Sequence, residues 1–170
     1  MTQAYLYTFN IGIPGDPQGA QWDHIVEALL AATGAPVAYG VPMKVAAGLV
    51  SGIQAAGDTG PAATPFGWIV RPYPIQNVAL LNDPLGTSTP PTTGKVNIMV
   101  RGYISAFLQD ATTVVLGQAV WIRTAATSGT KLFGGVQSST DGGACTQITN
   151  NTYFMGPADA NGNVVIAVNI

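Results

Sequence analysis

Apolar and polar residues alternate in short runs along most of this chain, and turn residues separate the runs every eight to twelve positions. The clearest run covers residues 95–108, where apolar side chains recur at period two. Its apolar members are Val96, Ile98, Val100, Ile104 and Leu108. Such alternation is typical of a strand that buries one face. The run is therefore predicted to be a long strand, with a bulge or bend at Gly102.

Shorter strands are predicted on both sides of this run. Their ranges are 37–45, 49–53, 66–72, 118–124, 132–136, 153–155 and 164–170. Loops rich in Gly, Pro and polar residues separate them, at 56–61 and 82–94 among others. Asn161-Gly162 stands between two apolar runs and favours a hairpin, because the tightest hairpin turns need positive φ at their central residues. Many short strands at this spacing predict a mainly β protein, either a small barrel or a sandwich.

The first 35 residues have a different pattern. One short helix is predicted over residues 22–33, because Trp22, Ile25, Val26, Leu29 and Leu30 share a helical face and Gly34 and Pro36 follow as a stop. Ahead of it, alternating apolar residues precede a Pro/Gly turn at 13–17. This alternation favours an extended arm lying on a neighbour over an edge strand. The chain is thus divided into an N-terminal arm and short helix (1–35) and a β domain (36–170).

Composition adds one strong constraint. Only 8% of the 170 residues are charged, where soluble domains carry about 25%. A soluble protein that lives alone normally covers itself with charge. We therefore expect this chain to hide much of its surface against other copies or within a larger assembly.

Several classes of function are disfavoured by the same composition. The six basic residues are scattered singly, whereas nucleic-acid binding needs clustered cations, so no direct nucleic-acid partner is expected. No apolar stretch approaches the roughly 20 residues of a membrane span. The N-terminus lacks the basic and apolar regions of a signal peptide, which favours synthesis in the cytoplasm.

Catalytic chemistry has few candidates. The carboxylates are isolated and mostly lie in turns, where they support local hydrogen bonds. His24 and Cys145 are the only histidine and the only cysteine, so any nucleophilic triad would have to use His24, with Cys145 as the obvious nucleophile. The simpler interpretation is that His24 is solvated and that Cys145 packs as a small apolar residue. One His and one Cys cannot build a zinc site, and 159–163 fits a hairpin better than a calcium loop. We therefore predict no catalytic residue, cofactor or metal.

Large apolar and aromatic side chains in polar or turn contexts remain as candidates for contacts with partners, since aromatic residues are enriched at protein interfaces. They are Tyr5, Tyr7, Phe9, Ile11, Trp22, Tyr73 and Phe107. The alternative, that most of them fill the core, stays open.

Five segments resemble, in order and spacing, the structural cement (head decoration) proteins of tailed phages. These are PVAYGVP (36–42), GWIVRPYP (67–74), DPLGTSTPP (83–91), VRGY (100–103) and FMGPADA (154–160), the last followed by 164–170. The similarity covers roughly residues 36–170. It implies a non-enzymatic β domain that assembles, commonly as a homotrimer, on the outer surface of the phage head after synthesis in the bacterial cytoplasm.

The resemblance also implies partners. They are the major capsid protein, whose subunits such a protein bridges, and further copies of the chain itself. On this hypothesis residues 1–35 reach the capsid lattice, and the seven interface candidates contact capsid or oligomer. A carbohydrate- or surface-binding β-sandwich module of a phage particle is the main alternative, and an enzyme using His24 and Cys145 is the weakest one.

Overall fold

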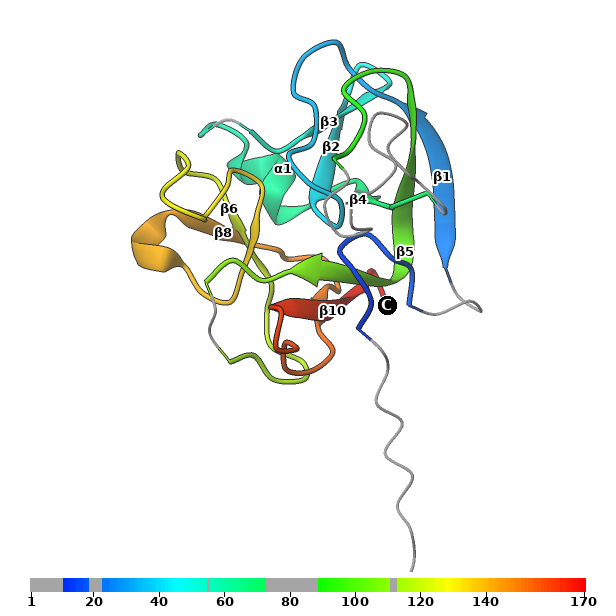
Figure 1. The fold of residues 1–170 in the computed structure, drawn as a ribbon. Helices are drawn as coiled ribbons and strands as arrows, with labels where there is room; N and C mark the ends of the chain where they lie inside the picture. Colours follow the sequence, from blue (N-terminus) through cyan, green and yellow to red (C-terminus); the bar gives the residue numbers. More distant parts are fainter. Residues whose placement is uncertain (1–10, 19–22, 55, 73–88, 111–112) are drawn as a thin grey trace, which may run out of the picture.

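The computed structural model describes residues 11–18, 23–54, 56–72, 89–110 and 113–170. These residues form a mainly β fold, which confirms the predicted fold class (Figure 1). The strands are β1 (His24–Leu29), β2 (Pro42–Ala46), β3 (Leu49–Gly52), β4 (Gly67–Ile69), β5 (Lys95–Phe107), β6 (Trp121–Arg123), β7 (Val136–Gln137), β8 (Cys145–Gln147), β9 (Tyr153–Phe154) and β10 (Asn163–Val168). A five-residue helix, α1 (Thr59–Ala63), and a 3₁₀ turn, η1 (Asp141–Gly143), complete the described elements.

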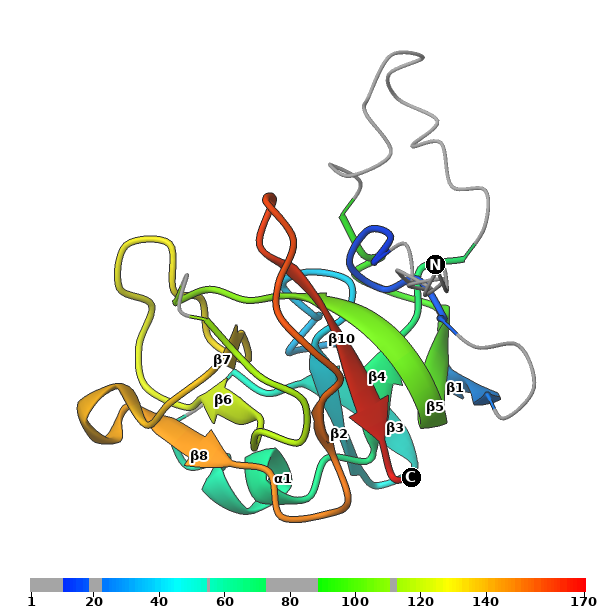
Figure 2. The same cartoon turned by 90° about the horizontal axis from the view of Figure 1, so that it is seen from below.

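The strands form two antiparallel sheets. The larger sheet has the order β3-β2-β4-β5-β10-β9, and β1 also pairs with β5. The smaller sheet has the order β7-β6-β8 and lies on the other side of β5 from β1 (Figure 2). The larger sheet curls until the end of β1 meets β3, but only one bridge, Leu30 to Val50, joins them. The arrangement is therefore sandwich-like and not a closed barrel.

Strand β5 is the common partner of most of the larger sheet. Its first half pairs with β1 and β4, and its second half pairs with β10. Residues 15–18 also bond to the second half, through Gly15 N to Ser105 O at 2.8 Å and Gln18 N to Tyr103 O at 2.7 Å. The β1 ladder shifts register between His24 and Ile25, next to Gly102 with φ of 138°. The irregularity predicted at Gly102 is confirmed.

Two apolar cores lie on the two faces of β4 and β5. Ile69 and Ile98 belong to a core with Leu30, Met43 and Val50. Their neighbours in sequence, Trp68 and Met99, point the other way into a core shared with the small sheet, which includes Ile122, Val136, Phe154 and Ile166. Because side chains alternate across a strand, two adjacent strands can close both cores at once.

The helix predicted over residues 22–33 is wrong, because His24–Leu29 form strand β1. The sequence also contains a period-two pattern, in which Val26, Ala28 and Leu30 face the core and Ile25 and Leu29 are exposed. The helical spacing and the strand spacing share the same apolar residues here. Backbone pairing with β5, a contact with residues about 70 positions away, decides between them.

Smaller differences concern loops and turns. The predicted loop 56–61 contains the start of α1, whose Ala62 is fully buried. The hairpin β9–β10 is confirmed, although of its two predicted turn residues only Gly162 has positive φ. Asp159 holds this turn, since its carboxylate accepts the N–H groups of Asn161 and Asn163 at 2.8 Å. The hairpin interpretation of 159–163 therefore has a local cause.

Gly40 offers a sharp stability test. Its φ is 70°, and a Cβ there would lie 2.5 Å from Ser105 O and 2.8 Å from Gly15 N. Gly48 has a similar φ of 78° with open space around it. We predict that Gly48→Ala lowers the free energy of unfolding by about 1–2 kcal/mol through φ alone. Gly40→Ala should cost roughly 1–3 kcal/mol more through overlap. Urea unfolding of both variants checks this, and equal losses would contradict it.

Candidate interaction surface

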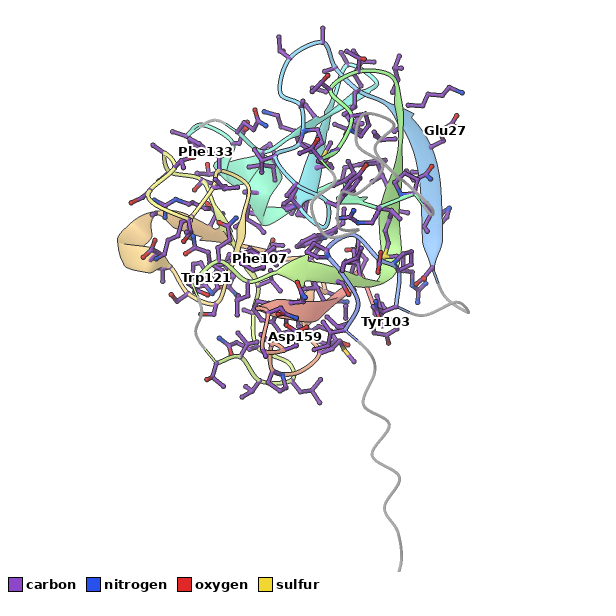
Figure 3. All side chains as sticks on the ribbon, viewed as in Figure 1. Glu27, Tyr103, Phe107, Trp121, Phe133 and Asp159 are labelled. Carbon is purple, nitrogen blue, oxygen red and sulfur yellow. The ribbon has the colours of Figure 1, made fainter. Side chains whose placement is uncertain are left out.

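Of the seven predicted interface residues, Tyr5, Tyr7, Phe9, Trp22 and Tyr73 lie outside the described residues. Ile11 is half-buried, and its carbonyl accepts a hydrogen bond from the Ser105 hydroxyl. Phe107 ends β5 and leaves 44% of its surface exposed, near the middle of the view in Figure 3. The structure brings Ile11 and Phe107 to the same region of the sheet, the second half of β5.

Phe107 borders an open groove of about 500 Å³. Its apolar walls come from four separate parts of the chain, namely Ile13 and Pro14, Val37, Phe107, and Leu132. Val37 is 37% exposed, so both it and Phe107 present apolar surface to solvent. We call this feature the β5 groove.

Tyr39 and Arg71 supply polar groups of the β5 groove. The Arg71 guanidinium lies 4.6 Å from the centre of the Tyr39 ring, and Arg71 Nε donates to Pro14 O at 3.2 Å. Burial raises the pKa of Tyr39, an effect that the charge of Arg71 partly offsets. Burial also lowers the pKa of Arg71, which Asp16 opposes. The cation is thus held in place by backbone and ring contacts.

The Tyr39 hydroxyl is unusual within this groove. Tyr39 is 2% exposed, and its Oη has no hydrogen-bond partner. A buried polar group without a partner costs about 1–3 kcal/mol. The hydroxyl has almost no accessible surface, so a molecule lying in the open groove does not reach it in this structure.

A second exposed apolar feature lies on the turn after β5. Val115 and Leu116 are 61% and 66% exposed, the highest values among the large apolar residues that the structure describes. The turn is firmly held, since Val114 is fully buried and Gly117 N donates to Phe154 O at 2.8 Å. Gln118 N closes the turn on Val115 O at 3.1 Å. We call Val115 and Leu116 the apolar tip.

Sequence reasoning missed the apolar tip and the exposed side chains of β1. A signal was present for the tip, because Val114, Val115 and Leu116 are consecutive and end at a glycine. Only one residue of such a run can point into a core at a turn, so the others must be exposed. For Ile25 and Leu29, which are 39% and 49% exposed, the helical interpretation hid the signal.

Charge on the described surface is largely paired. Lys44 forms an ion pair with Asp58 at 2.6 Å, and Lys95 forms one with Glu27 at 2.5 Å. Asp141 pairs with both Arg123 and Lys131, at 2.7 and 2.9 Å. Hydrogen bonding from Lys131 is the main reason that the pKa of Asp141 is lowered. Of these pairs, the one between Lys95 and Glu27 is well exposed and adds little stability, whereas Asp58 and Arg123 are buried. The pairing leaves few charges to repel an approaching neighbour.

The two candidate catalytic residues do not come together. His24 begins β1 of the larger sheet and Cys145 begins β8 of the smaller one, and these strands lie on opposite sides of the molecule (Figures 1 and 2). Cys145 is buried, and burial raises the pKa of its thiol to about 11. The described residues contain no cluster of three or more His, Cys, Asp or Glu side chains suited to a metal ion. Nor does any described helix have the length and hydropathy to cross a bilayer.

Comparisons with known proteins give one family match and one similar fold. The model of the structural cement protein family (E217 gp24/Pam3 gp6) matches residues 1–169. A chain in the solved structure of the capsid of Myoviridae phage XM1 has a similar fold, with a TM-score of 0.63 and 13% identity over 99% of this chain and 97% of that chain. A search of curated proteins gave no match.

The Cys145 thiol provides a test of the enzyme alternative. Because a pKa of about 11 leaves very little thiolate at pH 8, we predict that the folded protein resists iodoacetamide at that pH. The same chain in urea should react fully, as an unperturbed thiol with a pKa of about 8.5 does. Mass spectrometry of the intact chain measures both. Rapid labelling of the folded protein would show an activated thiol and revive the nucleophile hypothesis.

Proposed function

Because the chain belongs to the structural cement protein family, we propose that it binds the outside of the mature phage head as an oligomer and bridges neighbouring major capsid subunits. Family membership implies a capsid cement role and a place in the virion. The proposal adds three points to this role: an outer location on the head, contact with the major capsid protein, and a homotrimeric state. A fold shared with a chain of a phage capsid is consistent with it.

The match of the family model over residues 1–169 carries the proposal. The surface supports it independently. Only 8% of the residues are charged, and most described cations are in ion pairs. Many copies packed on one shell would repel one another if each carried a large net charge. A nearly neutral surface suits a protein that is crowded against identical neighbours.

The family is structural, and we propose that this chain has no enzymatic activity. In place of residues 1–35, which the resemblance suggested, we propose the apolar tip as the contact with the capsid, because Val115 and Leu116 are the most exposed large apolar residues that the structure describes. Burying a Val or Leu side chain contributes about 1.5–3 kcal/mol relative to leaving it in water. A rigid turn keeps most of that free energy for binding, because no loop has to be ordered when the partner arrives. Repetition over the copies of an oligomer then strengthens attachment through avidity.

The abundance of the chain in virions tests the proposal directly. We predict a copy number near that of the major capsid protein, because a cement protein covers the whole shell. Quantitative mass spectrometry of purified particles measures this ratio. A handful of copies per particle would indicate a vertex or tail component, and absence from particles would overturn the proposal.

Substitution of the apolar tip tests the capsid contact. We expect the double variant Val115→Ser/Leu116→Ser to keep its thermal stability, since both side chains are exposed in the free protein. Its affinity for heads that lack the protein should fall at least about 100-fold, as expected for the loss of two buried aliphatic anchors. Co-sedimentation with heads measures the affinity. Val45→Ser, which changes an apolar residue that is 50% exposed on β2, is the control and should bind as the wild type does.

A further inference from the structure

We propose that the β5 groove holds the N-terminal segment, residues 2–10, of a neighbouring copy of the chain. The inference rests on the oligomer of the proposed function and names the contact that holds it together. It assigns separate surfaces to separate partners, with the groove for another copy and the apolar tip for the capsid.

The groove has the size and lining of a binding site. Its volume of about 500 Å³ lies in the range of roughly 300–1,000 Å³ that is usual for ligand pockets. Val37, Phe107 and Leu132 provide apolar surface from loops and a strand end that pack from different sides. Such walls accept apolar side chains. Arg71 also lines the groove, but its guanidinium is already held by Pro14 O and the Tyr39 ring.

Main-chain pairing gives an extended segment a second source of contacts. An extended chain presents a backbone carbonyl about every 3.3 Å, and Gln109, Thr130 and Asn161 bring polar side chains to the lining of the groove. Docking of a peptide through main-chain hydrogen bonds, with side chains in flanking apolar pockets, is a common mode of recognition.

The sequence of residues 2–10 fits this site. The segment TQAYLYTFN carries no charge, and its aromatic residues Tyr5, Tyr7 and Phe9 alternate, so that an extended conformation would place them on one side. Each aromatic side chain buries about 150–250 Å². Three of them approach the roughly 800 Å² that each partner buries in a standard interface. An uncharged segment also leaves no unpaired charge in the groove.

The length of the segment allows exchange between copies. Ile11 is the first described residue, and its carbonyl accepts a hydrogen bond from the Ser105 hydroxyl. Ile13 and Pro14 form one wall of the groove, so the segment joins the chain two residues before this wall. Nine extended residues reach about 30 Å, which is enough to reach a neighbouring copy in the oligomer of the proposed function.

Mixing two cysteine variants of the full chain tests the exchange. One variant carries Thr8→Cys, and the other carries Thr130→Cys at an exposed position that lines the groove. After treatment of the mixture with a bismaleimide, whose spacer bridges thiols that do not touch, we expect a cross-linked dimer whose joined peptides, identified by mass spectrometry, contain both positions. The control replaces Thr130→Cys by Asn151→Cys, at an exposed position that does not line the groove, and should give no such linkage.

Two results would overturn the inference. One is a linkage that forms only inside single chains of the double variant Thr8→Cys/Thr130→Cys, because the segment would then occupy its own groove. The other is the absence of both linkages. Head binding is measured on the same proteins, so the two proposals fail separately: wild-type protein that binds heads without the linkage contradicts the exchange alone, and a linked oligomer that ignores heads contradicts the cement role alone.

Discussion

The backbone of β5 is the constraint on which the rest of the structure depends. β1, β4 and β10 and residues 15–18 all take hydrogen bonds from this one strand. A strand can satisfy two neighbours along its length, and β5 serves four segments by changing partners at Gly102. Phe107, at the C-terminal end of β5, borders the groove, and the apolar tip lies on a turn that follows in the sequence, so both surfaces follow that end of the strand.

This arrangement explains how a chain of modest length builds two cores. Trp68 and Ile69 on β4, and Ile98 and Met99 on β5, are fully buried and point alternately to opposite faces. Two central strands covered on both faces leave the outer strands to carry the exposed positions. The apolar surface that remains is therefore concentrated at strand ends, at the turn after β5 and on the edge strand β1, where neighbours in an assembly can reach it.

The separation of the surfaces bears on the symmetry of assembly. A trimer needs a heterologous contact, in which each copy offers two different patches. The exchange that we propose, a groove on one copy and an N-terminal segment from the next, would meet this requirement, whereas a single self-complementary patch would give a twofold dimer. The low charge of the chain is consistent with such close contact, because few cations or carboxylates must be desolvated.

Sequence alone determined the mainly β class, the long strand over residues 95–108, the irregularity at Gly102 and the hairpin ahead of 164–170, because period-two patterns and turn residues act locally. It also led to the family, through segments spread over residues 36–170. It named Ile11 and Phe107 but could not give the groove, whose lining runs from Ile13 to Asn163 and so joins residues 150 positions apart. Only the tertiary structure decided that residues 24–29 form a strand, since helical and strand spacings share their apolar residues and the free edge of β5 selects the strand. The tertiary structure also decided which apolar residues are exposed. Val115 and Leu116 are as apolar as any core residue, but they stay in solvent because Val114 and Gly117 are anchored against the folded sheets.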